Sequence, residues 1–254
     1  MEKVSIIMPS YNSERFIAEA IESVIKQTYN NWELLIVDDC SKDKTIEIVE
    51  TFLKLDSRIK LFVLDENSGA AIARNKALEM SEGRFIAYLD SDDLWNECKL
   101  EKQVKFMLEN NVCFVCCDYN KIKEDGTSLN KTIKLPNRID YKLFLRNTII
   151  QTAGVIVDTH FVPKEKLIMP NVRRRQDAGT WCQILKSGFD CYRIPECLAT
   201  YRVVSNSLSS NKFKAIRGTW FLYRKIEKLN FFYACFCFVG YAFNACLKRI
   251  YRRK

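Results

Sequence analysis

Short apolar runs alternate with segments of helical periodicity through the first 120 residues of this 254-residue chain. Within the runs, apolar and polar side chains do not alternate, which is typical of strands buried on both faces. Between the runs, apolar side chains recur every three or four residues, as in amphipathic helices. The expected strands are residues 4–8, 34–37, 61–64, 85–89 and 112–119. This order predicts an α/β fold with a central, mostly parallel sheet and helices on both faces.

Polar segments follow each of the first four expected strands. They are residues 10–12, 38–41, 65–69 and 90–93, and three of the four contain acids. Ligands bind beyond the carboxyl ends of the strands in sheets of this kind, so we expect these segments to carry the chemistry. Their acids predict one polar cleft that is suited to a metal ion.

Basic residues are concentrated at the C-terminal end. The whole chain has a formal net charge of +9. Residues 206–254 hold eleven Lys and Arg side chains and one acid, Glu227, so the rest of the chain is almost neutral. The sequence has no internal repeat and no linker rich in Gly or Ser. We therefore expect one domain over residues 1–210 and a basic, aromatic tail over residues 211–254.

Cysteine use and the N-terminal sequence both indicate the cytoplasm. The chain has 11 cysteines, an odd number, and several lie in apolar runs, where Cys acts as a small hydrophobic residue in a reducing compartment. The first residues, MEKVSIIMPSYN, place two charges before a short apolar run that Pro9 interrupts, unlike a signal peptide. A composition of 48% hydrophobic and 28% charged residues excludes a disordered chain.

An acidic cluster, DSDD at residues 90–93, follows the fourth expected strand. Carboxylates two residues apart can share Mg²⁺ or Mn²⁺, which prefer one or two carboxylates together with phosphate oxygens and water. The acids could instead cap the helix that follows Trp95. A third interpretation is a phosphohydrolase with Asp90 as nucleophile, although Leu94 departs from that motif. No phosphate-binding Gly-rich loop follows the first strand, and the single histidine, His160, has no partner at metal-ligand spacing.

A series of ordered motifs resembles the family 2 glycosyltransferases, which have the Rossmann-like GT-A fold. The sequences VSIIMPSYN, ELLIVDDCSKDKT and NSGAAIARNKALEMSEGRFIAYLDSDDLW follow one another within residues 3–105. The resemblance resumes at QDAGTW (residues 176–181) and at YRVVSNSLS (residues 201–209). Bacterial members that build O-antigen or capsule sugars on a lipid carrier are the most similar in size. The resemblance implies an inverting, metal-dependent glycosyltransferase.

The resemblance also implies roles for the first strand exits. Pro9 and Tyr11 would form part of a uracil pocket, with Tyr11 stacked on the base. Asp39, with Asp38 as its neighbour, would hydrogen-bond the uracil. Arg74 would face the ribose or a phosphate, or else pair with a carboxylate at the edge of the core.

The family places the metal and the diphosphate at the acidic cluster. Asp90 would hold the ribose, and Asp92 would bind the Mn²⁺ or Mg²⁺ that bridges the diphosphate oxygens. Arg202 would neutralise diphosphate charge or serve a structural role. Relatives often carry a His shortly after the Tyr-Arg pair, whereas this chain has Val203 and Val204 there.

Inverting transfer also needs a carboxylate that accepts the proton of the acceptor hydroxyl. The family places this base in a Glu-Asp pair at the start of a helix that contains a Trp. Here the pair is Gln176-Asp177, followed by Trp181, so Asp177 matches the base and Gln176 departs from the pattern. The alternative is an ordinary acid at a helix N-terminus, stabilised by the helix dipole.

The tail contains 17 residues, 231–247, with one amide and no charge, between basic clusters. A spanning helix needs about 20 apolar residues, whereas aromatics flanked by cations suit a helix lying on anionic lipid. Three interpretations remain: a membrane-surface anchor, a helix packed on the protein or a partner, and a true span. No motif indicates nucleic-acid binding.

These observations predict transfer of a hexose or N-acetylhexosamine from a UDP-sugar to a hydroxyl of a lipid-linked or oligosaccharide acceptor, at the inner face of the cell membrane. One alternative is a phosphohydrolase that uses Asp90 as its nucleophile. The other is a non-catalytic, membrane-bound module with a degenerate GT-A fold.

Overall fold

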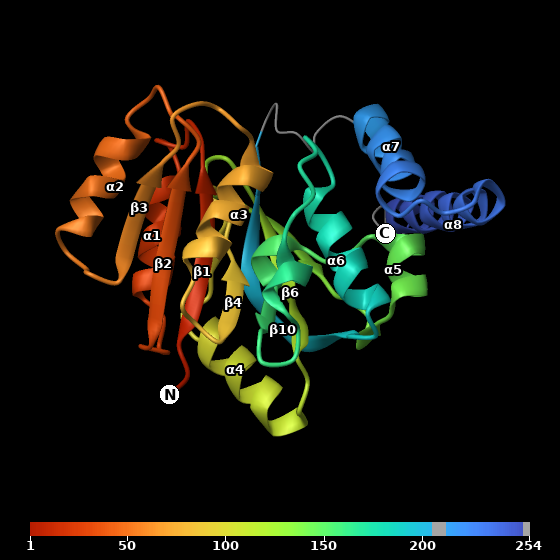
Figure 1. The fold of residues 1–254 in the computed structure, drawn as a ribbon, viewed down its shortest axis with the longest axis horizontal. Coiled ribbons are helices and arrows are strands. Elements are labelled where there is room, and N and C mark those ends of the chain that lie inside the picture. The colour runs from red at the N-terminus through yellow and green to blue at the C-terminus, as the bar shows by residue number, and fades with distance from the viewer. Residues whose placement is uncertain (205–211, 251–254) are drawn as a thin grey trace.

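The computed structural model describes residues 1–204 and 212–250, which form one sheet with helices on both faces (Figure 1). The described sheet runs in the order β3-β2-β1-β4-β9-β6-β10-β5, with β7 paired to β6 and β8 paired to β10. The strands are β1 (Val4–Ser10), β2 (Trp32–Asp38), β3 (Ile59–Val63), β4 (Phe85–Tyr88), β5 (Leu94–Trp95), β6 (Phe114–Lys123), β7 (Ser128–Ile133), β8 (Arg138–Ile139), β9 (Ile156–Asp158) and β10 (Cys191–Val203).

Helices cover the two faces of the sheet in separate groups. They are α1 (Ile17–Ile25), α2 (Thr45–Leu53), α3 (Ala70–Met80), α4 (Lys99–Asn110), α5 (Tyr141–Asn147), α6 (Gln176–Lys186), α7 (Lys212–Phe221) and α8 (Phe231–Ile250), with short turns η1 (Thr152–Gly154), η2 (Lys164–Leu167) and η3 (Leu222–Ile226). Side chains of α1, α2 and α4 form one core layer, and side chains of α3, α5, α6 and α8 form the other. The predicted coverage of both faces is confirmed.

The first four strands are parallel, as the sequence predicts. β1 pairs with β2 and β4, and β2 pairs with β3, all in parallel register. Their side chains are buried on both faces in β1, β2 and β4. The carboxyl ends of these strands therefore meet at one edge, where the polar segments that follow them lie together.

The second half of the sheet is mixed. β9 lies between β4 and β6 and is antiparallel to both. β6 and β10 are parallel, whereas β5, β7 and β8 add antiparallel pairs. The chain thus leaves β6 and returns after about 30 residues to insert β9 next to β4. The position of β9 in the sheet therefore depends on pairing between strands that are far apart in the sequence.

The tail packs against the second half of the sheet domain. Figure 1 shows α7 and α8 beside α5 and α6, on the side opposite α1 and α2. Leu222, Tyr223, Ala234 and Cys237 are buried in the same core layer as Trp181. Within the described residues, no helix combines the length and the apolar character that a membrane crossing requires. Residues 205–211, which include the expected start of the tail and part of the last motif, lie outside the described residues.

Candidate active site

Asp38 joins the exits of β1 and β2. Its side chain is fully buried. Ser10 Oγ donates to Asp38 Oδ2 at 2.8 Å, and Ser41 donates from its amide to Oδ1 at 2.7 Å and from its hydroxyl to Oδ2 at 2.6 Å. These donors satisfy a carboxylate that would otherwise be costly to bury. Asp38 therefore lies one layer beneath the surface that a ligand would touch.

Asp39 fixes the loop that opens α3. The backbone amides of Ser68 and Gly69 donate to its Oδ1 and Oδ2 at 2.6 and 2.8 Å. Gly69 has φ +95°, a left-handed conformation that favours glycine, and the chain turns into the helix there. Asp39 is only 3% exposed, but each carboxylate oxygen has two lone pairs, so it keeps acceptor capacity beyond these two hydrogen bonds.

Tyr11 leaves the end of β1 with its side chain 48% exposed, whereas Pro9 is buried within the strand. The next residue, Asn12, has φ +47°, and its amide donates to Ser41 Oγ at 2.8 Å. This contact fixes the first exit against the second. An accessible aromatic ring is what stacking on a base requires.

Arg74 and Asp90 form an ion pair at the edge of the core. Arg74 Nη2 lies 2.5 Å from Asp90 Oδ1, and the Arg74 side chain is only 8% exposed. Burial lowers the pKa of Arg74, but the charges of Asp90 and Asp177 outweigh that effect and raise the pKa above its usual value. Among the described residues, none accepts a hydrogen bond from the buried Arg74 Nε. The guanidinium thus pairs with one predicted site carboxylate, Asp90, and feels the charge of a second, Asp177. Its pairing with Asp90 is the alternative that the sequence leaves open.

The remaining acids of the cluster resist ionisation. Burial, and then the nearby charge of Asp90, raises the pKa of Asp92 to about 6. Asp93 is fully buried, and burial together with Asp92 and Asp90 raises its pKa well above the usual range. Concentrated negative charge of this kind is relieved by a cation.

The donor set fits Mn²⁺ or Mg²⁺ that is shared with a substrate. Among the described residues, no three Asp, Glu, Cys or His side chains lie close enough together to hold a metal ion by themselves. Asp92 is partly exposed and offers carboxylate oxygens, and these cations also accept phosphate and water oxygens. A cation at Asp92 would therefore require ligands from a bound diphosphate.

Arg202 forms hydrogen bonds with the acidic loop, residues 90–93. Its side chain is buried, and its amide donates to Asp93 Oδ1 at 2.9 Å. The guanidinium donates to the carbonyl oxygens of Asp92 and Glu124 at 2.9 and 3.1 Å and to Glu19 Oε2 at 2.7 Å. These contacts use all three guanidinium nitrogens. The geometry matches the structural role that the sequence left as an alternative to diphosphate binding.

Asp177 lies in the first turn of α6, as predicted. Thr152 Oγ1 donates to Asp177 Oδ2 at 3.3 Å. The neighbouring residue, Gln151, donates from Nε2 to Asp93 Oδ2 at 3.3 Å. Two adjacent residues at η1 therefore connect the acidic loop to the candidate base. Sequence reasoning missed both, because a Gln-Thr pair in an irregular segment carries no local signal.

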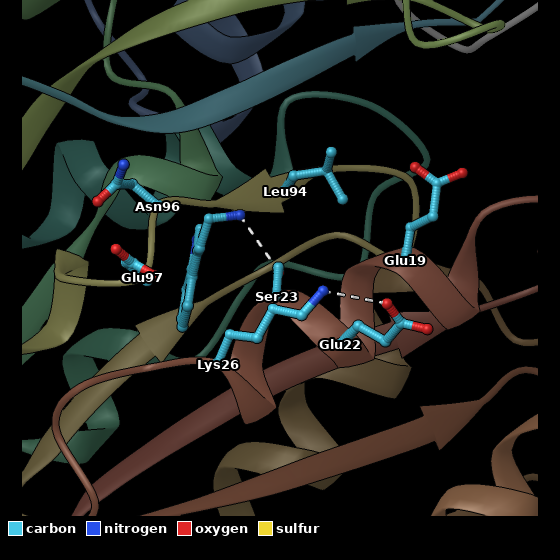
Figure 2. Close-up of a pocket in the computed structure, with 8 residues that line it drawn as sticks. Glu19, Glu22, Ser23, Lys26, Leu94, Asn96 and Glu97 are labelled. Carbon is cyan, nitrogen blue, oxygen red and sulfur yellow. Dashed lines mark hydrogen bonds and ion pairs between the residues drawn. The ribbon is translucent and has the colours of Figure 1, made fainter.

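A separate hollow of about 410 Å³ is lined by α1 with Lys26 and by residues 94–97 (Figure 2). The backbone amide of Trp95 donates to Ser23 Oγ there at 3.2 Å. Glu19, which binds Arg202, lies at its rim. None of its lining residues is a predicted site residue, so we assign it no ligand.

Residues 5–168 match the family model described as glycosyl transferase family 2. This match covers more than half of the chain and includes the exits of β1, β2 and β4. The chain belongs to glycosyl transferase family 2. The protein is therefore a glycosyltransferase, and membership gives no support to the phosphohydrolase interpretation of Asp90.

Two bacterial relatives are similar over most of the chain. TuaG of Bacillus subtilis (strain 168), whose name refers to teichuronic acid biosynthesis, is 49% identical over 247 residues, which is 97% of each chain. WfgD of Escherichia coli, named UDP-Glc:alpha-D-GlcNAc-diphosphoundecaprenol beta-1,3-glucosyltransferase, is 43% identical over 221 residues. That alignment covers 85% of this chain and 83% of WfgD.

Solved transferase structures confirm the GT-A fold. Staphylococcus aureus TarS in complex with UDP-GlcNAc aligns with a TM-score of 0.72 at 20% identity, over 95% of this chain and 72% of TarS. The mannosyltransferase PcManGT of Pyrobaculum calidifontis, in complex with GDP-Man and Mn²⁺, aligns with a TM-score of 0.70 at 21% identity. That alignment covers 90% of this chain and 65% of PcManGT.

Proposed function

We propose that this family 2 enzyme transfers a hexose or N-acetylhexosamine from a UDP-sugar to a hydroxyl of a lipid-linked saccharide, with inversion at the anomeric carbon. The carrying observation is the arrangement around Arg74, whose guanidinium pairs with Asp90 and lies within electrostatic reach of Asp177. Donor-side and acceptor-side carboxylates thus approach one point from two parts of the chain, as a single displacement requires.

The donor would bind at the exits of β1, β2 and β4. Tyr11 offers an exposed ring for the base, and Asp39 keeps lone pairs for a uracil N–H. Asp90, which pairs with Arg74, would accept a hydrogen bond from a ribose hydroxyl. Asp92 would hold Mn²⁺ or Mg²⁺, which neutralises the charge that develops on the leaving diphosphate.

The acceptor hydroxyl would attack the anomeric carbon from the side of α6. Asp177 would take the hydroxyl proton as the new bond forms, with its carboxylate oriented by Thr152. The leaving UDP would carry away the bonding electrons. WfgD, by its name, uses UDP-Glc and a diphosphoundecaprenol-linked acceptor. Its similarity to the present protein supports a lipid-linked acceptor in surface polysaccharide synthesis here as well.

The tail would hold the enzyme on the anionic inner face of the cell membrane. One side of α8 packs inward through Ala234 and Cys237. The opposite side presents four apolar side chains at helical spacing. They are Phe232 (84% exposed), Phe236 (60%), Val239 (67%) and Phe243 (62%). Together with the basic residues of the tail, such a face suits insertion at the level of lipid headgroups.

The reaction is tested by UDP binding and a donor screen. UDP is expected to raise the melting temperature only with Mn²⁺ or Mg²⁺, by ligand linkage. UDP release is then measured with UDP-glucose, UDP-galactose and their N-acetyl forms, using a lipid-diphosphate-linked sugar as acceptor. A protein that UDP never stabilises, with or without metal, would contradict the proposal and favour a degenerate module.

Membrane attachment is tested by flotation with vesicles that contain anionic lipid. The double variant Phe232→Ser and Phe236→Ser is expected to lose most vesicle binding because it removes two inserting rings. Phe161→Ser is the matched control, since Phe161 is an exposed phenylalanine outside the tail. Equal flotation of the double variant and wild type would rule out this face as the anchor.

A further inference from the structure

Arg175 connects the tail to the candidate base. It immediately precedes α6, two residues before Asp177. Its Nη2 lies 3.2 Å from Tyr241 Oη on α8 and 3.4 Å from the carbonyl oxygen of Ala215 on α7. One guanidinium group therefore bridges both tail helices at the start of the helix that carries Asp177.

The backbone of Arg175 depends on outside support. Arg175 has φ +63°, in the left-handed region that a non-glycine residue seldom adopts. No side-chain hydrogen bond caps α6 at this position. The Arg175 carbonyl accepts the first helical hydrogen bond, from the amide of Gly179 at 2.9 Å. The conformation of this one residue therefore sets the direction of the turn that contains Asp177.

The tail also contacts this region at two glycines. A Cβ on Gly179 would lie 2.9 Å from Pro170 Cγ and 3.4 Å from Ile226 Cγ2, so the first turn of α6 lies directly against η3. A Cβ on Gly218 would lie 3.4 Å from Arg175 Cγ, so α7 approaches the stem of that side chain closely. The contacts leave little room for α6 to shift while the tail is docked.

We propose that Arg175 is a positioning residue through which the docked tail holds Asp177 in place to accept the proton of the acceptor hydroxyl, so that the tail contributes to turnover as well as to membrane attachment. This inference rests on the proposed function, because it takes Asp177 as the base. Loss of the Arg175–Tyr241 contact allows the start of α6 to relax. The effect falls on the chemical step and not on donor binding, because Asp39, Asp90 and Asp92 belong to other elements.

The test is steady-state kinetics of the full-length enzyme in detergent, which separates turnover from vesicle binding. Tyr241→Phe removes only the hydroxyl that Arg175 contacts, and we expect kcat to fall about fivefold, with the KM for the UDP-sugar and the Tm unchanged. Tyr233→Phe is the matched control on the same helix, and its kcat is expected to equal that of wild type. Arg175→Gly tolerates the left-handed backbone without strain, so it is expected to fold and to lose about tenfold in kcat, whereas Arg175→Lys recovers part of that loss.

The double variant Arg175→Gly, Tyr241→Phe is expected to be no slower than Arg175→Gly alone, because Arg175→Gly already removes the contact that Tyr241→Phe breaks. Wild-type kcat in Tyr241→Phe, or losses that multiply in the double variant, would overturn the inference. If Asp177→Asn abolishes transfer while Tyr241→Phe is silent, only this inference fails. If Asp177→Asn retains transfer, the base assignment and the inference fail together.

Discussion

The two sides of the candidate active site are built differently. On the donor side, the carboxylates are held by groups at the exits of the parallel strands: Asp38 by Ser41, three residues away, Asp90 by Arg74, 16 residues away, and Asp39 by the amide of Gly69, 30 residues away. On the acceptor side, the partners lie outside this repeated strand–turn–helix pattern. Thr152 contacts Asp177 across 25 residues, and Arg175 contacts Tyr241 across 66.

This difference has consequences for how each side responds to change. The donor side repeats one strand–turn–helix unit, so its contacts form wherever neighbouring strands align. The acceptor side forms only after β9, α6 and the tail have docked. We therefore expect substitutions on the acceptor side to affect turnover, and substitutions on the donor side to affect binding of UDP and metal.

The largest expected effect is on turnover through the acceptor side. Asp177→Asn removes the group that takes the hydroxyl proton, and general bases contribute roughly 10²- to 10⁴-fold. We expect kcat for sugar transfer to fall by at least about 100-fold, with metal-dependent stabilisation by UDP intact. Asp190→Asn, a substitution just before the start of β10, serves as the control. Joint loss of UDP binding and transfer in Asp177→Asn would mean that the two sides are not separable.

The next effect concerns metal at the donor side. Asp92→Asn removes the carboxylate charge that would hold the cation, so UDP is expected to stabilise the variant to the same small extent with and without Mn²⁺. Activity is expected to fall by about 100-fold, comparable to the loss of one preorganised charge in other active sites. Thermal shift with UDP across a Mn²⁺ titration measures this, with Asp125→Asn in the exposed β6–β7 turn as control. A normal Mn²⁺ response in Asp92→Asn would place the metal elsewhere.

A buried lysine, Lys99, makes the stability of the folded protein depend on pH. Lys99 Nζ donates to Gln103 Oε1 at 2.7 Å and lies 3.9 Å from the Trp95 ring centroid, while Gln103 donates to the carbonyl of Gly154. Burial lowers the pKa of Lys99 from 10.5 to about 7. Between these two pH values the unfolded chain binds more protons than the folded one, so the stability of the wild type rises with pH.

Lys99→Met removes this penalty. The variant is expected to be more stable than wild type at pH 7 by a few kcal/mol, since a tenfold change in proton affinity corresponds to about 1.4 kcal/mol. The difference is expected to shrink as pH rises toward 10.5. Urea unfolding at pH 7, 8.5 and 10 measures it, and Lys102→Met, an exposed lysine on the same helix, provides the control. A pH-independent difference would show that Lys99 stays protonated in the folded protein.

The smallest expected effect comes from Arg202, which contacts the acidic loop. Arg202 on β10 reaches Asp92 across 110 residues and Glu19 across 183. Arg202→Lys keeps the charge but loses the forked geometry, so the acidic loop is held less firmly. We expect UDP·Mn²⁺ affinity to fall by about tenfold, worth about 1.4 kcal/mol, with kcat at saturation almost unchanged. Arg193→Lys on the same strand is the control. A tenfold loss of kcat instead would place Arg202 in the chemistry.

The sequence alone predicts the parallel strands of the donor side and the polar segments that follow them. The continuous apolar runs give β1, β2, β3 and β4, and the polar segments after them give Asp39, Asp90 and Asp92. Parallel strands bring their carboxyl ends to one edge, so a one-dimensional pattern becomes a spatial cluster without further information. Position 177 follows from a motif, although its partners do not.

The tertiary structure decides those features that no periodic pattern in the sequence indicates. β9 enters between β4 and β6 because long-range pairing, and not the order along the chain, fills that place in the sheet. Gln151, Thr152 and Arg175 acquire their roles only when residues 25 to 66 positions apart meet. The tail shows the same division. Its apolar and basic composition can be read from the sequence. Burial of Ala234 and Cys237 shows which side of α8 faces the protein and which side remains exposed.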